Sequence, residues 1–104
     1  MAYKLVWFVP EESLDATREA VFGAGAGRIG DYEHCSWYTA GIGTFLGGEG
    51  TDPAIGQAGR EEWVAELRVE TVVPDARMNE VVRALVEAHP YEEVAYDLYP
   101  LAEL

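Results

Sequence analysis

The stretch His89-Pro-Tyr-Glu-Glu-Val-Ala-Tyr-Asp-Leu-Tyr-Pro-Leu101 decides the fold of this chain. Pro90 ends a preceding helix, because it lacks a backbone N–H and pushes the residue before it out of the helical region. After it, Val94, Tyr96 and Leu98 occur at every second position, which is the period of a strand with two distinct faces. The stretch therefore predicts a helix that is followed by a closing strand.

Upstream, the chain switches repeatedly between strand-like and helix-like patterns. The patterns predict, in order, a strand at 3–9, a helix with the apolar stripe Leu14, Thr17, Val21 and Phe22, strands at 32–46 and 62–73, and a helix with the stripe Met78, Val81, Val82 and Leu85. Gly41 and Gly43 predict a bulge or bend within the second strand. The order β-α-β-β-α-β predicts an α+β, ferredoxin-like fold, with an antiparallel four-stranded sheet and two helices on one face.

Length and charge narrow the possible functions. The 104 residues have room for one domain, 1–104, and 49% hydrophobic content is ample for its core. A net charge of −12 makes general binding to nucleic acid or to an anionic membrane improbable, since both require concentrated Lys and Arg. No apolar run reaches membrane-spanning length, and no secretory signal is visible. The single cysteine is typical of a reducing, cytoplasmic setting.

The first strand is apolar on both sides. Leu5, Trp7 and Val9 lie on one face, while Val6 and Phe8 lie on the other. Because both helices are expected on the same side of the sheet, the other face of this strand needs a different cover. We therefore expect self-association through the helix-free sheet face, for which a dimer would suffice.

Several segments together carry a family resemblance. They are Val9–Glu11, Gly23–Gly27, Ile29–Ser36, Gly43–Phe45, Glu70–Pro74 and His89–Leu101. Over nearly its whole length the chain resembles the PII-like or CutA-like domain that is inserted in bacterial Nif-three-like proteins (the NGG-one-interacting factor, YqfO-type family). The pairing of Gly-Asp-Tyr-x-His-Cys with His-Pro-Tyr-Glu-Glu is the most specific part of the match.

The resemblance implies a ferredoxin-like domain that associates as a trimer. It also implies that the dinuclear metal site of the full-length family is built by two flanking lobes, which this chain lacks. His34 and His89 are the only histidines here. We therefore expect a non-enzymatic domain. The residues agree, because Cys35 and Ser36 near His34 have no separate base-and-orienter pair and no nucleophile-elbow motif is present.

One glycine motif imitates a nucleotide site. Gly25-Ala-Gly-Arg-Ile-Gly30 spells G-x-G-x-x-G, but the dinucleotide fingerprint works only after a strand and at the start of a helix. Here the motif follows a helix and leads into a strand. It is interpreted as a helix C-cap and turn that require positive φ angles.

The best candidate ligand-binding set draws on two segments. Its members are Glu33, His34, Cys35, His89, Tyr91, Glu92 and Glu93. Imidazole, thiolate and carboxylate groups suit a divalent transition metal, with His34 and His89 as the first candidates for ligands. Neighbouring strand residues point to opposite faces, however. The alternative is that both histidines hydrogen-bond within the chain and hold the second strand and the last loop in register, with Cys35 as a small buried residue.

The connector Gly47–Gly59 is longer than a hairpin needs. It could be a flexible lip that contacts a ligand or a protein partner, or merely a glycine-rich tether. Three functions stay open: an oligomeric regulatory module that binds a small ligand or cation, a structural assembly or docking protein with no small ligand, and a protein for transition-metal binding or tolerance.

Overall fold

The computed structural model describes residues 1–52 and 54–103; Pro53, which belongs to the predicted 47–59 connector, and Leu104 lie outside the described residues. The predicted α+β order is confirmed. The elements are β1 (Ala2–Val9), a 3-10 turn (Glu11–Ser13), α1 (Leu14–Gly23), β2 (Ser36–Leu46), β3 (Glu61–Pro74), a second 3-10 turn (Asp75–Arg77), α2 (Met78–Ala88) and β4 (Tyr96–Pro100).

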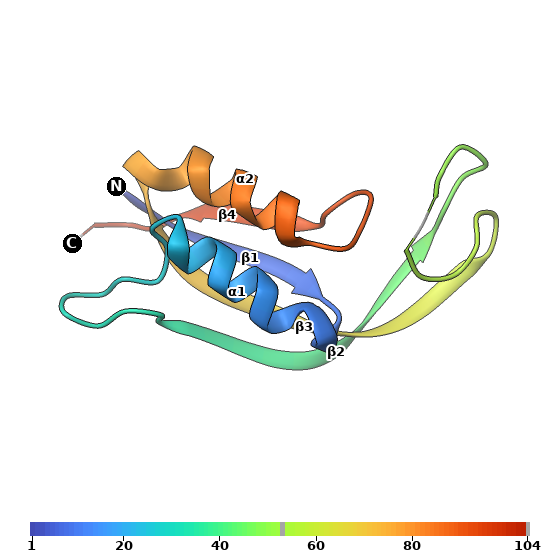
Figure 1. Cartoon of the computed structure of the whole chain (residues 1–104), viewed down its shortest axis with the longest axis horizontal. Coiled ribbons are helices and arrows are strands. Elements are labelled where there is room, and N and C mark those ends of the chain that lie inside the picture. The colour runs from blue at the N-terminus through green and yellow to red at the C-terminus, as the bar shows by residue number, and fades with distance from the viewer. Residues whose placement is uncertain (53, 104) are drawn as a thin grey trace.

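The four strands form one antiparallel sheet in the order β2-β3-β1-β4. Figure 1 shows α1 and α2 side by side on one face of this sheet, as the two crossovers predict. The start of β1 and the residue after β4 lie together at one end of the sheet, where the Leu101 N–H donates to the Ala2 carbonyl over 2.9 Å. No helix in the described part of the chain is long and apolar enough to cross a membrane.

The core lies between the sheet and the helices. Leu5, Trp7 and Val9 of β1 are buried there, and all four residues of the predicted α1 stripe are buried against them. From α2, Val81 and Leu85 complete the core. The polar group of the buried Trp7 side chain has a hydrogen-bond partner, because its indole N–H donates to the Thr17 hydroxyl over 3.1 Å. The helical periodicity therefore identified the buried faces correctly.

The helix-free face is not as bare as the sequence suggested. Val6 is fully buried and Phe8 is half-buried within the single chain. Charged side chains beside Val6 and Phe8 cover them. Glu70 accepts a hydrogen bond from Arg68 over 3.1 Å and pairs with Lys4 over 3.2 Å. The Arg68 guanidinium lies 5.7 Å from the centre of the Phe8 ring. Long charged side chains can cover apolar surface with their stems. Two apolar residues on this face of β1 therefore do not by themselves require a partner.

The second strand begins later than predicted, at Ser36 instead of residue 32. Ile29 and Tyr32 pair with each other across a tight turn, and Gly30 within that turn has a φ of +57°. His34 then takes a φ of +58°, in the left-handed region that strands exclude. Local turn geometry thus overrides the β propensity of these residues.

Beyond the helices, β2 and β3 continue as a two-stranded arm. Only the Leu67–Pro74 part of β3 pairs with β1, whereas its residues 61–66 pair with β2 alone. We call residues 41–46 and 61–66, with the 47–59 loop at their tip, the arm; Figure 1 shows it bending away from the body of the domain. The pairing from Ser36–Thr71 to Leu46–Glu61 is continuous, so of the two predicted alternatives β2 has no bulge but does bend where the arm leaves the body (Figure 1).

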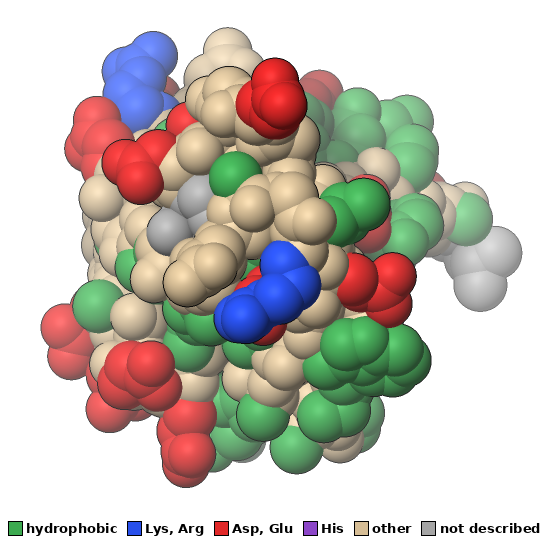
Figure 2. Space-filling model, turned by 90° about the vertical axis from the view of Figure 1, so that its right-hand side faces the viewer, with side chains coloured by type: hydrophobic (Ala, Val, Ile, Leu, Met, Phe, Trp, Pro, Cys, Tyr) green, Lys and Arg blue, Asp and Glu red, His purple; other side chains and the backbone are tan. Residues whose placement is uncertain are grey.

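The arm exposes apolar side chains. Ile42 and Trp63 lie on one face of this ribbon by their register and are 67% and 72% exposed, and Tyr38, just before the arm on the same face of β2, is 50% exposed. Seen from the end of the arm, hydrophobic side chains gather toward one side of the molecule, and the charged groups on this end are mostly carboxylates (Figure 2). The surface at the arm therefore combines apolar and acidic side chains.

Candidate ligand site

The glycines after α1 perform the predicted structural task. Gly25, Gly27 and Gly30 all have positive φ, at +117°, +83° and +57°. A Cβ at Gly27 would lie 2.7 Å from the Phe22 ring and 3.2 Å from the Cys35 nitrogen, so only glycine fits there. The segment is a helix-terminating turn and does not enter a helix. The interpretation as a C-cap and turn is confirmed.

Glu33, His34 and Cys35 lie in the loop between α1 and β2. The Cys35 N–H donates to the Gly27 carbonyl over 2.8 Å, and the Cys35 carbonyl accepts from the Thr71 hydroxyl over 2.7 Å. The His34 ring stacks on Phe22 at 4.8 Å with an interplanar angle of 9°. Glu33 is exposed. These contacts hold the loop against the sheet.

His89 begins the loop between α2 and β4 and uses both of its ring nitrogens. Its Nδ1 accepts the Tyr91 N–H over 3.2 Å, so its Nε2 carries the proton and donates to the Phe8 carbonyl over 2.6 Å. Burial lowers the pKa of His89, and the hydrogen bond to Phe8 only partly opposes this effect. His89 is therefore a neutral histidine that fastens the last loop to the end of β1, which is the structural role that the sequence left open.

The structure does not bring the two predicted segments together within one chain. The His34 loop is anchored on Val72 and Thr71, which pair with Lys4 and Leu5, whereas His89 is anchored on Phe8. The two histidines are thus anchored at different levels along β1. Among the residues the structure describes, no group of three or more His, Cys, Asp or Glu side chains is placed to hold a metal. The geometry argues against a metal shared by His34 and His89 of one chain.

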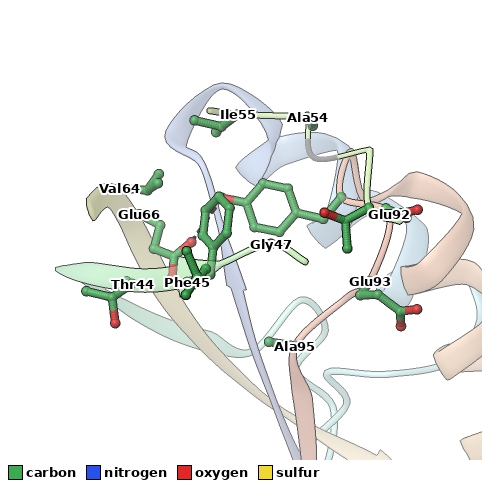
Figure 3. Close-up of a pocket in the computed structure, with 14 residues that line it drawn as sticks. Thr44, Phe45, Gly47, Ala54, Ile55, Val64, Glu66, Glu92, Glu93 and Ala95 are labelled. Carbon is green, nitrogen blue, oxygen red and sulfur yellow. Dashed lines mark hydrogen bonds between the residues drawn. The ribbon is translucent and has the colours of Figure 1, made fainter. Parts of the chain in front are cut away.

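Tyr91, Glu92 and Glu93, by contrast, share a cavity of about 290 Å³ between the arm and the α2–β4 loop. Figure 3 shows Glu92 and Glu93 on the side of this cavity opposite Phe45 and Glu66. The described lining residues are mostly apolar: Gly43, Thr44, Phe45, Leu46, Gly47, Thr51, Ala54, Ile55, Val64, Glu66, Tyr91, Glu92, Glu93 and Ala95. The volume is at the lower end of the range for small-molecule sites.

Tyr91 connects the last loop to the arm. Its hydroxyl donates to Glu66 Oε2 over 3.0 Å, and its ring packs edge-on against His89 at 4.7 Å. Burial, together with the hydrogen bond to the Glu66 carboxylate, raises the pKa of the Tyr91 phenol. The phenol is therefore a stable neutral donor. Gly43 gives the carboxylate its room, because a Cβ there would collide with Glu66.

The glycine-rich loop folds over the same cavity. Thr51, Ala54 and Ile55 line it, and the Asp52 N–H donates to Glu92 Oε2 over 3.0 Å. At the loop's base, the Gly59 N–H donates to the Gly47 carbonyl over 2.6 Å. The loop and the acidic His-Pro-Tyr-Glu-Glu segment are therefore in direct contact, although they are far apart in the sequence.

Sequence reasoning missed Phe45, Val64 and Glu66. Nothing in one sequence reveals that the Glu66 carboxylate meets Tyr91 and lies against Gly43. Only the register of β2 on β3 could have identified these residues. The predicted lip role of the 47–59 loop, however, matches the place of its described residues.

The polar groups of the cavity are few and mostly acidic. Its described lining holds three carboxylates, one phenol and two threonine hydroxyls, with no histidine, cysteine, lysine or arginine. A nucleophile next to a base, as covalent catalysis requires, is not among these residues. The site offers apolar contact and negative charge.

Comparison with known proteins gives a consistent result. No protein-family model matches the chain. It is 54% identical over 100 residues to a protein of Halalkalibacterium halodurans named GTP cyclohydrolase 1 type 2 homolog, and 55% identical over 98 residues to a protein of the same name from Mycobacterium tuberculosis. These matches cover 96% and 94% of this chain, but only 27% and 26% of the relatives. The chain thus spans about a quarter of their length.

Solved structures agree with the sequence comparison. A Bacillus cereus protein related to NIF3 matches with a TM-score of 0.85 and 45% identity, over 98% of this chain and 26% of that protein. CutA from Archaeoglobus fulgidus matches with a TM-score of 0.73 at 13% identity, over 99% and 86% of the two chains. GlnK of Bacillus subtilis gives a TM-score of 0.58 at 11% identity, over 93% and 83%. The last two establish only the shared ferredoxin-like fold.

Proposed function

This chain belongs to the Nif-three-like family as its CutA-like and PII-like domain, and we propose that it is a non-enzymatic, ligand-responsive module. The observation that carries the proposal is the cavity between the arm and the α2–β4 loop, to which Thr51, Ala54 and Ile55 of the 47–59 loop contribute lining residues. A molecule in this cavity would contact both segments at once. The single, unpaired Cys35 fits a reducing, cytoplasmic setting for such a module.

A single residue, Glu92, connects the cavity to the 47–59 loop. Glu92 lines the cavity and also accepts the Asp52 N–H of the loop, so a ligand that draws the Glu92 carboxylate inward removes a loop contact. Five of the thirteen loop positions are glycine, which lets the loop adopt another conformation at little steric cost. The loop conformation is therefore the output that we assign to this module.

We assign no catalytic step to this domain. Its cavity lacks a nucleophile-and-base pair among the described residues, and the chain corresponds to only about a quarter of the relatives named GTP cyclohydrolase 1 type 2 homolog. Any such chemistry would belong to parts of those proteins that this chain does not match.

A thermal-shift panel of nucleotides, amino acids, amines and the chlorides of Mg²⁺, Zn²⁺, Ni²⁺ and Cu²⁺ tests the proposal. A ligand at 100 times its Kd contributes about 2.7 kcal/mol, which raises the Tm of a domain of this size by roughly 10 °C. Ala95→Phe, which fills the cavity, should abolish the shift, whereas Ala16→Phe on the exposed side of α1 should preserve it. A flat response of the wild type to the whole panel would reject the function.

The transition-metal alternative has its own test. If a metal is bound by His34 and His89, from one chain or from two, both His34→Ala and His89→Ala should abolish stabilisation by Zn²⁺, Ni²⁺ or Cu²⁺. Equal responses of both variants and the wild type would dismiss this alternative.

Self-association is a second candidate function, and the edge of the sheet favours it. β2 is an edge strand of 11 residues without charge or proline, so it lacks the usual protection against pairing with another chain. We propose that copies associate through the sheet, as a trimer or a dimer, with contacts on the helix-free face and near the β2 edge, where Tyr38, Ile42 and Trp63 are exposed on the opposite face. In light scattering after size-exclusion chromatography, Ile42→Lys should reduce the molar mass, and Val86→Lys on α2 should not. A monomeric wild type would refute association.

A further inference from the structure

We propose that the ligand of the cavity is a small organic ammonium ion with an apolar body. This inference rests on the proposed function, because it names the class of molecule that the module binds. It follows from the charge, the partners of the carboxylates and the character of the walls.

The charge of the site is one-sided. Glu66, Glu92 and Glu93 line the cavity, and its described lining has no basic residue. None of the ion pairs found among residues 1–52 and 54–103 involves these three carboxylates. Glu66 accepts only the Tyr91 hydroxyl, and Glu92 accepts only the Asp52 N–H, among the described contacts. In a chain of net charge −12, the missing counterpart of this site is a cation.

The residues that line the cavity favour an organic cation over a metal ion. A hard cation such as Mg²⁺ or Ca²⁺ needs several oxygen ligands around one point, yet no group of three or more candidate ligands converges among the described residues. The carboxylates instead lie on opposite sides of a cavity whose walls include Phe45, Ile55 and Val64 (Figure 3). Such walls provide contact area for a hydrocarbon body, which a metal ion does not have.

Aromatic residues add a specific preference. Phe45 and Tyr91 both line the cavity, and an ammonium group attracts the face of an aromatic ring when it lies within about 6 Å of the ring centre. The Tyr91 hydroxyl is already engaged with Glu66, so its ring is held in place. A ligand with one positive charge and a short apolar chain or ring would satisfy the carboxylates and the walls together, whereas an anion such as a nucleotide would be repelled.

Isothermal titration calorimetry of the full chain with matched probes tests this inference. The probes are phenethylammonium chloride, 2-phenylethanol and 3-phenylpropionate, which share a phenyl-alkyl body but differ in charge, together with ammonium chloride and zinc chloride. We expect phenethylammonium to bind at least tenfold more tightly than any other probe. Glu66→Gln and Glu93→Gln should each weaken its binding several-fold, while Glu19→Gln on α1, which removes the same charge outside the cavity, should leave it unchanged.

Three results would overturn the inference. Equal or tighter binding of 2-phenylethanol would mean that the cavity takes a neutral ligand, and the proposed function would survive. Equal binding of ammonium or zinc would mean that the carboxylates attract cations without use of the apolar walls. If no probe binds, the ammonium class is wrong, whereas the proposed function falls only if the wider thermal-shift panel also leaves the wild type unstabilised.

Discussion

The body of the domain and its arm share two strands but differ in what holds them together. In the body, β3 lies between β1 and β2 and packs against the helices, so Val69 and Val73 are fully buried. In the arm, the same strand has a single neighbour, and from Glu61 to Glu66 it has no buried residue. A two-stranded ribbon of this kind is only marginally stable in water.

The body therefore holds most of the buried residues, whereas the proposed function is assigned to the arm and the loop that it contacts. The body contains the hydrophobic core, and the likeness to CutA and GlnK structures is a likeness of fold. The cavity, the glycine-rich loop and the exposed side chains of Ile42 and Trp63 all belong to the arm or to its contact with the α2–β4 loop. The proposed function is thus assigned to the part of the chain that has the fewest buried residues.

Two tryptophans give the largest test of this contrast. Trp7 in the body is fully buried, whereas Trp63 on the arm is 72% exposed. We expect Trp7→Ala to lower the free energy of unfolding by about 3–5 kcal/mol, and Trp63→Ala to change it by no more than about 0.5 kcal/mol. Urea unfolding at low protein concentration measures both. A similar loss for the two variants would show that the arm is packed as tightly as the body.

His89 tests the joint between the two regions. His89→Phe keeps an aromatic ring but leaves the Phe8 carbonyl and the Tyr91 N–H without their side-chain partner, which should cost about 2–4 kcal/mol. Because the pKa of His89 is lowered in the folded chain, its contribution is complete above the ordinary value of 6.5. That contribution is lost as the pH falls from 6.5 through the lower folded pKa, because the unfolded chain binds the proton first.

Urea unfolding of the wild type and of His89→Phe between about pH 7.5 and pH 5 measures this effect. The difference in stability between the two proteins should shrink as the pH falls through the window below 6.5. A difference that stays constant with pH would contradict the neutral, doubly bonded imidazole.

The sequence predicted features of the body better than it predicted the residues that line the cavity. Periodicity identified the buried faces of both helices, because burial on a helix repeats with the helix period. The acidic Tyr91–Glu93 segment was recognised, but Glu66 was not, since its partner comes from 25 residues away. Val6 and Phe8 appeared to need a partner because a sequence does not show that Arg68 and Glu70 fold over them. Long-range side-chain geometry is the information that one sequence lacks.

Two glycines with similar φ angles, one in the body and one in the arm, give a further comparison, with an intermediate expected loss of stability. Gly27 in the body and Gly59 on the arm have φ angles of +83° and +80°, but only Gly27 is crowded, by the Phe22 ring. Gly27→Ala should therefore combine left-handed strain with overpacking, for a loss of roughly 3 kcal/mol. Gly59→Ala should cost about 1 kcal/mol of strain alone. Equal losses in thermal or urea unfolding would mean that crowding at Phe22 is relieved by a shift of the ring.

The smallest expected effect on stability is the most informative about the arm. Glu92→Ala removes the acceptor of the Asp52 N–H, and because the bond is exposed, the free energy of unfolding should change by no more than about 0.5 kcal/mol. Hydrogen exchange of the Asp52 amide should nevertheless accelerate, since this bond is what protects it. Glu93→Ala is the matched control, because Glu93 lines the same cavity without a hydrogen bond to the described part of the loop. If both variants exchange at the wild-type rate, the Glu92 carboxylate does not hold the loop, and the proposed path from cavity to surface is broken at its first step.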